Sequence, residues 1–123
     1  MTQFMKHIEK EIALPLKKQV DHRKGQVVSK TIVQNEHVTM TLYAFDKDEI
    51  LASHKHKGDV FLYIIEGTAQ VTVGEVENVV TGGEIIVIPA NKLYAVYALE
   101  SFKMLSVIIF GYIIRWHETD QTI

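Results

Sequence analysis

The sequence contains no cysteine, only two prolines and a single tryptophan among its 123 residues. Without cysteine the chain has no disulfide, no thiolate nucleophile and no cysteine-ligated zinc site. A cysteine-free composition suits a reducing compartment, so we expect a cytoplasmic protein. A single domain of this length buries enough surface to fold without a disulfide or a structural metal.

An excess of charge of one sign is lacking too. Thirteen Lys and Arg residues oppose fifteen Asp and Glu residues, and the formal net charge is −2. A nucleic-acid-binding protein concentrates basic residues on one face, so we expect no nucleic-acid partner. The N-terminus lacks the basic stretch and apolar run of a signal peptide. The longest apolar segment, residues 104–114, is about half the length of a membrane-spanning helix, so we expect no membrane partner.

The chain does contain alternation of apolar and polar residues with a period of two, from residue 26 onward. Eight or more short, β-branched segments separated by turn residues predict strands, with almost no room for helices. This pattern indicates a closed or double-sheet β architecture. We divide the chain into an N-terminal arm (residues 1–25), a β-barrel (residues 26–114) and a polar C-terminal tail (residues 115–123).

The N-terminal arm has a weak helical pattern. Phe4, Ile8 and Ile12 are spaced four residues apart, and Pro15 ends the pattern because proline cannot continue a helix. We therefore expect the arm to flank the barrel as a short helix followed by a loop.

Two predicted strands, residues 61–65 and 104–110, are apolar on both faces. A strand in a lone barrel needs apolar side chains on its inner face only. We therefore expect their outer faces to be covered by a partner subunit in a homodimer. The alternative cover is the N-terminal arm, folded over the sheet.

Two segments carry a more specific pattern. Residues 54–67 begin with His54-Lys55-His56 and end at Gly67, and residues 83–94 contain Pro89. Together they resemble the two signature motifs of the cupin superfamily. The first motif is His-x-His, three or four residues, Glu or Gln, six residues, Gly; the second is Gly, five residues, Pro-x-Gly, two residues, His. The resemblance covers about residues 26 to 110. It implies an all-β fold, the antiparallel double-sheet jelly-roll β-barrel of small single-domain cupins of unassigned function.

The resemblance also implies a four-ligand metal site, of which two ligands are present. His54 and His56 are two residues apart on a strand, so their side chains point to the same side. The family's carboxylate falls on Val60 and its last histidine falls on Tyr94. Asp59 is a carboxylate one residue out of register, and such a shift turns a side chain to the opposite face of a strand.

Two imidazoles alone rarely hold a transition metal tightly, because such sites use three or four protein ligands. No cofactor is therefore certain. A zinc, nickel, iron or manganese ion at His54 and His56 would be weakly held, with water or an anionic ligand completing its shell. The alternative is a polar histidine pair hydrogen-bonded to neighbouring groups or water. The predicted apolar pocket is lined by Tyr94, Asp59, Val60 and Met40.

The sequence leaves three functions open. No nucleophile elbow and no phosphate-binding glycine loop is present, and a cupin fold by itself selects no reaction. The leading hypothesis is a cupin that binds a small molecule in its interior pocket beside a degraded metal site. One alternative is a metal-dependent oxygenase or isomerase with a reduced His54/His56 centre; the other is a structural or regulatory dimer without a ligand. No pattern identifies a substrate or a catalytic residue.

Overall fold

The structure is a computed structural model that describes residues 4–111. Within this range the chain forms nine strands and one short 3₁₀ helix, and no α-helix. The predicted tail, residues 115–123, and the last three residues of the predicted barrel lie outside the described residues. The elements are η1 (Leu16–Lys18), β1 (Val27–Gln34), β2 (Val38–Phe45), β3 (Ile50–His54), β4 (Asp59–Glu66), β5 (Thr68–Val73), β6 (Val76–Thr81), β7 (Ile85–Ile88), β8 (Tyr94–Ala98) and β9 (Phe102–Ile109).

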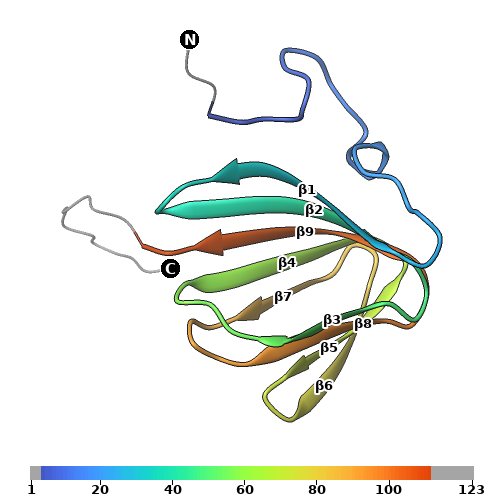
Figure 1. Ribbon diagram of the computed structural model, residues 1–123, viewed down its shortest axis with the longest axis vertical. Coiled ribbons are helices and arrows are strands. Elements are labelled where there is room, and N and C mark those ends of the chain that lie inside the picture. Colours follow the sequence, from blue (N-terminus) through green and yellow to red (C-terminus); the bar gives the residue numbers. More distant parts are fainter. Residues whose placement is uncertain (1–3, 112–123) are drawn as a thin grey trace.

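The strands build two antiparallel sheets, one of five strands in the order β1-β2-β9-β4-β7 and one of four strands in the order β3-β8-β5-β6. The sheets face each other, and hydrogen bonds do not join them into a closed barrel (Figure 1). Alternating side chains from both inner faces meet between the sheets, as in other β-sandwiches. The predicted double-sheet jelly-roll fold is confirmed.

The main core lies between the two sheets. Phe45 and Phe102 occupy facing positions on β2 and β9, and their fully buried rings stack at 4.6 Å between centroids. Such stacking adds about 0.5–1.5 kcal/mol to the burial of the two rings. The other large buried side chains of this core include Leu62, Ile64, Val71, Ile88, Val96 and Met104.

Gly67 makes the turn between β4 and β5, as the first motif predicts. Its φ of +86° lies in the left-handed region that glycine readily adopts. A Cβ atom at this position would collide with the backbone of Ser101 and Phe102. The motif glycine is therefore required both by its own backbone conformation and by the close approach of another chain segment.

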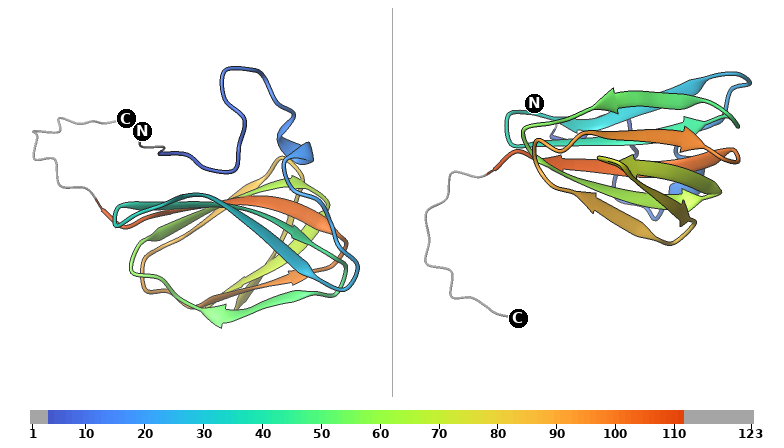
Figure 2. Two further views of the ribbon diagram at one scale, coloured as in Figure 1. Left: turned by 45° about the horizontal axis from the view of Figure 1, so that its top comes forward. Right: turned by 90° about the horizontal axis from the view of Figure 1, so that it is seen from below.

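Residues 4–13 of the N-terminal arm form no helix, so the expected helix before Pro15 is wrong. His7 and Glu11 have φ angles of +60° and +72°, which interrupt any helix over this stretch. The arm instead crosses the outer side of the five-stranded sheet, where Val20 is buried against Leu42 and Ala44 (Figure 2). The same cluster includes Ile65 and Leu105, so the arm covers part of the outer faces of the two strands that are apolar on both sides.

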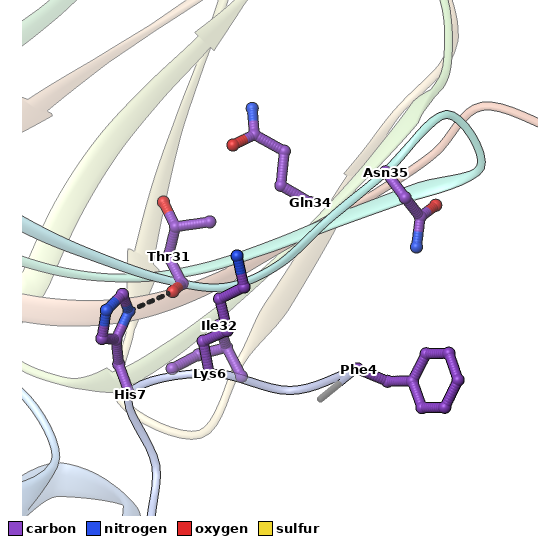
Figure 3. A pocket seen from close by; sticks show the side chains of 7 residues that line it. All are labelled: Phe4, Lys6, His7, Thr31, Ile32, Gln34 and Asn35. Atoms are coloured by element: carbon purple, nitrogen blue, oxygen red, sulfur yellow. Dashed lines mark hydrogen bonds between the residues drawn. The ribbon is translucent and has the colours of Figure 1, made fainter. Parts of the chain in front are cut away.

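Two hydrogen bonds attach the start of the arm to the free edge of β1. The Lys6 amide donates to the Ile32 carbonyl at 2.8 Å, and the His7 Nδ1–H donates to the Thr31 carbonyl at 3.0 Å (Figure 3). An uncovered edge strand is a template for unwanted pairing, and these bonds occupy part of it.

The cover also reaches β9, where the Lys103 ammonium donates to the Lys17 carbonyl in η1, but Phe61, Ile85 and Val87, on the same outer face, are exposed. The homodimer expected from these strands stays a prediction. Within residues 4–111 there is no helix long and apolar enough to cross a membrane.

Candidate functional site

His54, His56 and Tyr94 meet at one end of the space between the sheets. β3 ends at His54, which lies directly opposite Tyr94 at the start of β8. The ring centroid of His54 is 4.5 Å from that of Tyr94 and 4.8 Å from that of His56, whose ring stands almost perpendicular to it. The structure thus brings together three of the residues that the sequence places at a site.

These three side chains line a cavity of about 240 Å³. Nine of its twelve lining residues carry a hydroxyl, amide or imidazole group, and none carries a carboxylate, ammonium or guanidinium group. The expected apolar pocket is therefore wrong, because threonine and serine occupy inward positions near the two histidines. The lining residues are Thr31, Gln34, Thr39, Thr41, Tyr43, Leu51, His54, His56, Tyr94, Met104, Ser106 and Ile108.

Several hydroxyl groups of this lining have no partner among residues 4–111. Thr41 and Ser106 are 6% and 5% exposed, yet neither their hydroxyls nor those of Tyr43 and Tyr94 hydrogen-bond to any described group. A buried polar group without a hydrogen bond costs about 1–3 kcal/mol. The cavity therefore presents hydroxyls that water or a ligand can satisfy.

A backbone contact fixes the tautomer of His54. Its Nδ1 lies 2.8 Å from the Ala52 carbonyl oxygen, and a carbonyl only accepts, so Nδ1 carries the proton. In the neutral ring Nε2 is then an acceptor. His54 can accept a hydrogen bond from a ligand hydroxyl or offer one lone pair to a metal.

Burial favours the uncharged form of three titratable side chains in the cavity. It lowers the pKa of His56 from its ordinary value, and electrostatic repulsion from the neighbouring His54 lowers it further. Burial also raises the pKa of Tyr94, with a smaller contribution from Tyr43, and it raises the pKa of Tyr43 itself. At neutral pH the cavity therefore contains neutral His56, Tyr43 and Tyr94.

The turn between β7 and β8, part of the second motif, is tied to the segment that carries His56. The amide of Asn91 donates to the His56 carbonyl at 2.7 Å, and the amide of Ala90 donates to Asp59 Oδ1 at 2.8 Å. Asn91 stands at the family's glycine position and has a φ of +66°, a conformation that asparagine tolerates better than most residues. Asp59 thus holds the turn, and it is exposed rather than part of the cavity lining.

Val60 and Met40 are not among the residues that line the cavity. Val60, at the family's carboxylate position, is buried in the core between the sheets. Met40 lies opposite Val107 and packs in the cluster under the N-terminal arm, whereas the neighbouring Thr41 lies opposite Ser106 and faces the cavity. Met40 therefore does not line the predicted pocket, because the apolar side of β2 is its outer side.

Sequence reasoning missed the inward-facing polar residues of β2 and β9. The alternation of residues 37–44 separates the β2 members of this set from the apolar residues of the strand, and this is the signal that could have located them. The inward set comprises Thr39, Thr41, Tyr43 and Ser106.

The donor set does not fit a tightly held transition metal. Among the described residues there is no group of three or more His, Asp or Glu side chains placed to hold an ion. His54 and His56 supply two imidazoles, and the raised pKa of Tyr94 disfavours the phenolate that would serve as a third ligand. A metal held by the two histidines stays a prediction, and no chemistry is derived through it.

A second pocket, of about 360 Å³, lies between the arm and β1 and shares Thr31 and Gln34 with the cavity (Figure 3). Lys6 and His7 from the arm line it, and the Lys6 side chain reaches toward Gln34. Both arm residues are exposed. The arm thus borders one wall of the cavity.

Comparison with known proteins places this geometry in a family. A model of the cupin domain matches residues 41–108, more than half of the chain. No curated protein matches. A conserved protein of unknown function from Streptococcus pyogenes is 30% identical, with a TM-score of 0.88 over 91% of this chain and 98% of its own.

Two further solved structures agree. A cupin superfamily protein from Desulfitobacterium hafniense is 26% identical, with a TM-score of 0.83 over 87% of this chain and 98% of its own. A cupin 2 conserved barrel domain protein from Leptotrichia buccalis is 35% identical, with a TM-score of 0.75 over 76% of this chain and 46% of its own. On the matched motifs, the double-sheet fold and these relatives, the chain belongs to the cupin domain family.

Proposed function

We propose that this cupin binds a small, uncharged, hydroxyl-rich molecule in the cavity between its sheets. The observation that carries the proposal is the cavity lining, in which nine of twelve residues offer neutral hydrogen-bonding groups. Hydroxyls that both donate and accept suit a ligand that does the same, such as a polyol or a monosaccharide. Leu51, Met104 and Ile108 supply apolar contacts for the carbon skeleton of such a ligand.

Size and charge narrow the class of ligand. The volume of about 240 Å³ lies below the roughly 300–1,000 Å³ of sites for drug-sized molecules. A carboxylate or phosphate would enter a cavity without a cationic side chain in its lining, and burying an unpaired charge is strongly unfavourable. A neutral molecule of monosaccharide size is therefore favoured over its acidic or phosphorylated derivatives.

Isothermal titration calorimetry with defined probes tests the proposal. We expect glucose or myo-inositol to bind and gluconate and glucose 6-phosphate to bind more weakly or not at all. Thr41→Val and Ser106→Ala each remove one cavity hydroxyl, and each is expected to weaken binding roughly two- to tenfold. Thr72→Val is the matched control, because Thr72 lies on the outer side of the four-stranded sheet. Preference for the charged probes, or equal affinities in all variants, would contradict the proposal.

A metal-dependent cupin enzyme of oxygenase or isomerase type, with a reduced His54/His56 centre, is the second candidate. It is favoured by one observation: the His54 Nδ1 donates to a backbone carbonyl, as metal-ligating histidines often do. Elemental analysis of the purified protein tests it. Metal near one equivalent that disappears in the double variant His54→Ala, His56→Ala would support this candidate; metal content unchanged by that variant would remove it.

A further inference from the structure

A β-bulge in β1 turns a second side chain of this strand toward the cavity. The pairing of β1 with β2 shifts register between Thr31 and Val33, so Ile32 has no partner on β2. Thr31 and Gln34 are three residues apart, and in a regular strand they would point to opposite faces. Because the bulge inserts one extra residue, both line the cavity, whereas Ile32 and Val33 both pack in the outer cluster under the arm (Figure 3).

The arm is attached at this bulge, beside an open side of the cavity. β1 is an edge strand of the five-stranded sheet, and β3 is an edge strand of the four-stranded sheet. Both strands contribute residues to the cavity lining, so one side of the cavity lies between these two edges. The hydrogen bonds of the arm to the carbonyls of Thr31 and Ile32 hold Lys6 and His7 at the edge of β1.

The pocket between the arm and β1 adjoins the cavity. We call it the arm pocket; its residues are the seven drawn in Figure 3. It shares Thr31 and Gln34 with the cavity and adds an ammonium group, on Lys6, and an aromatic ring, on Phe4, which is 82% exposed. Within residues 4–111, neither the Lys6 ammonium nor the Gln34 amide forms a hydrogen bond or an ion pair. The arm pocket thus presents free polar groups next to an apolar surface.

We propose that the arm pocket is a second subsite of the binding site and that the ligand is a neutral disaccharide. This inference rests on the proposed function, because the first sugar unit occupies the cavity of about 240 Å³. The second unit extends past the edge of β1 into the arm pocket of about 360 Å³. There Lys6 and Gln34 donate hydrogen bonds to its hydroxyls, and the ring of Phe4 packs against its C–H groups.

A neutral second unit is favoured over an acidic one by the exposure of Lys6. The Lys6 side chain is exposed, and no other lysine or arginine lines the arm pocket. Solvent screens an exposed charge, so an ion pair between Lys6 and an acidic group would add little affinity. Hydroxyl groups, by contrast, can use the Lys6 ammonium and the Gln34 amide together.

Isothermal titration calorimetry with glucose, maltose and maltobionate tests the subsite. We expect maltose to bind about tenfold more tightly than glucose, and maltobionate no more tightly than maltose. Lys6→Met removes the ammonium and keeps the apolar stem, and it is expected to weaken maltose binding roughly three- to tenfold while leaving glucose binding unchanged. Lys10→Met, at another exposed lysine of the arm that does not line the arm pocket, is the matched control and is expected to change neither affinity.

The outcomes separate the subsite from the cavity. Equal affinities for glucose and maltose overturn the subsite, as does maltose binding that Lys6→Met leaves unchanged; glucose binding that Thr41→Val still weakens then keeps the cavity as the binding site. Tighter binding of maltobionate than of maltose overturns the neutral disaccharide. Absence of binding by both glucose and maltose overturns the proposed function, and the subsite with it.

Discussion

The two faces of β2 carry opposite kinds of side chain, in the reverse of the usual order. Its outward face is apolar and includes Leu42 and Ala44, which the N-terminal arm buries. Its inward face carries Thr39, Thr41 and Tyr43, which line the cavity. Both faces are removed from bulk water, but by different means: the outer face by a segment of the same chain, the inner face by the opposite sheet.

This difference shows that alternation separates the two faces of a strand without saying which one points into the barrel. An inward polar face without protein partners is unfavourable unless a ligand or water satisfies it, so it is not explained by folding alone. The outer apolar face, by contrast, is explained by the arm. The outer face of β2 therefore serves stability, and binding by its inner face is what we propose.

The largest effect on stability is expected from a substitution in the contact between the N-terminal arm and the outer face of β2. Val20→Asp places a carboxylate in the buried contact of the arm with Leu42 and Ala44, and we expect it to lower the free energy of unfolding by about 3–5 kcal/mol. Urea unfolding monitored by circular dichroism measures this. Ala13→Asp adds the same charge at an exposed position of the arm and is expected to change stability by less than about 0.5 kcal/mol. Equal effects of the two changes would mean that the arm is not packed on the sheet.

A smaller loss is expected at the turn that borders the cavity. Asp59→Ala removes the acceptor of the Ala90 amide and is expected to cost about 1–2 kcal/mol in unfolding experiments. Because the adjacent Asn91 amide bonds to the His56 carbonyl, the NMR signals of the His56 ring are expected to shift as well. Asp59→Asn keeps an acceptor and should restore most of the stability and of the His56 ring signals. If Asp59→Ala left the ring signals unchanged, this turn would not influence the position of His56 in the cavity.

Removal of a hydroxyl from the inner face of β2 is expected to leave the free energy of unfolding nearly unchanged. Thr41→Val replaces a hydroxyl without a described partner by a methyl group of similar size, and we expect the free energy of unfolding to stay within about 1 kcal/mol or to rise. Chemical denaturation in the absence of ligand measures this. A loss as large as that of Val20→Asp would show that Thr41 serves folding, and the division between the two faces of β2 would fail.

The smallest effect concerns pH. In the unfolded chain His56 titrates near 6.5, and in the folded protein its pKa is lower, so acid favours the unfolded state. The stability that neutral His56 contributes is present above about pH 6.5 and is lost as the pH falls from there through the lowered folded pKa. We expect His56→Gln to flatten the decline of stability between pH 7 and pH 5, measured by urea unfolding. If the slope of the free energy of unfolding against pH were unchanged in this variant, the proton responsible for the decline would bind to a group other than His56.

The fold was predictable because the motif spacing fixes features that the backbone itself requires. Gly67 has to adopt a positive φ beside the backbone of Phe102, and an alternating pattern places His54 and His56 on one side of a strand. The same registers brought Tyr94 to the two histidines. Counting along a strand was sufficient for these positions.

Other features carried no signal that one sequence reveals. The extended arm depends on positive φ angles at His7 and Glu11, two residues that equally suit a helix boundary or a loop. The wrong inner face of β2, and with it Met40, followed from assuming that apolar side chains point inward. Only the position of the arm shows why they point outward.

The central claim is that the neutral, hydroxyl-rich cavity is the binding site of this cupin. A ¹H–¹⁵N NMR titration with glucose or myo-inositol tests it most directly, because each backbone amide reports on its own surroundings. The account predicts shifts confined to cavity residues such as Thr41, His56 and Tyr94, which Thr41→Val diminishes. Shifts confined to the arm pocket or to the outer faces of the sheets, or no shift with any neutral probe, would contradict it.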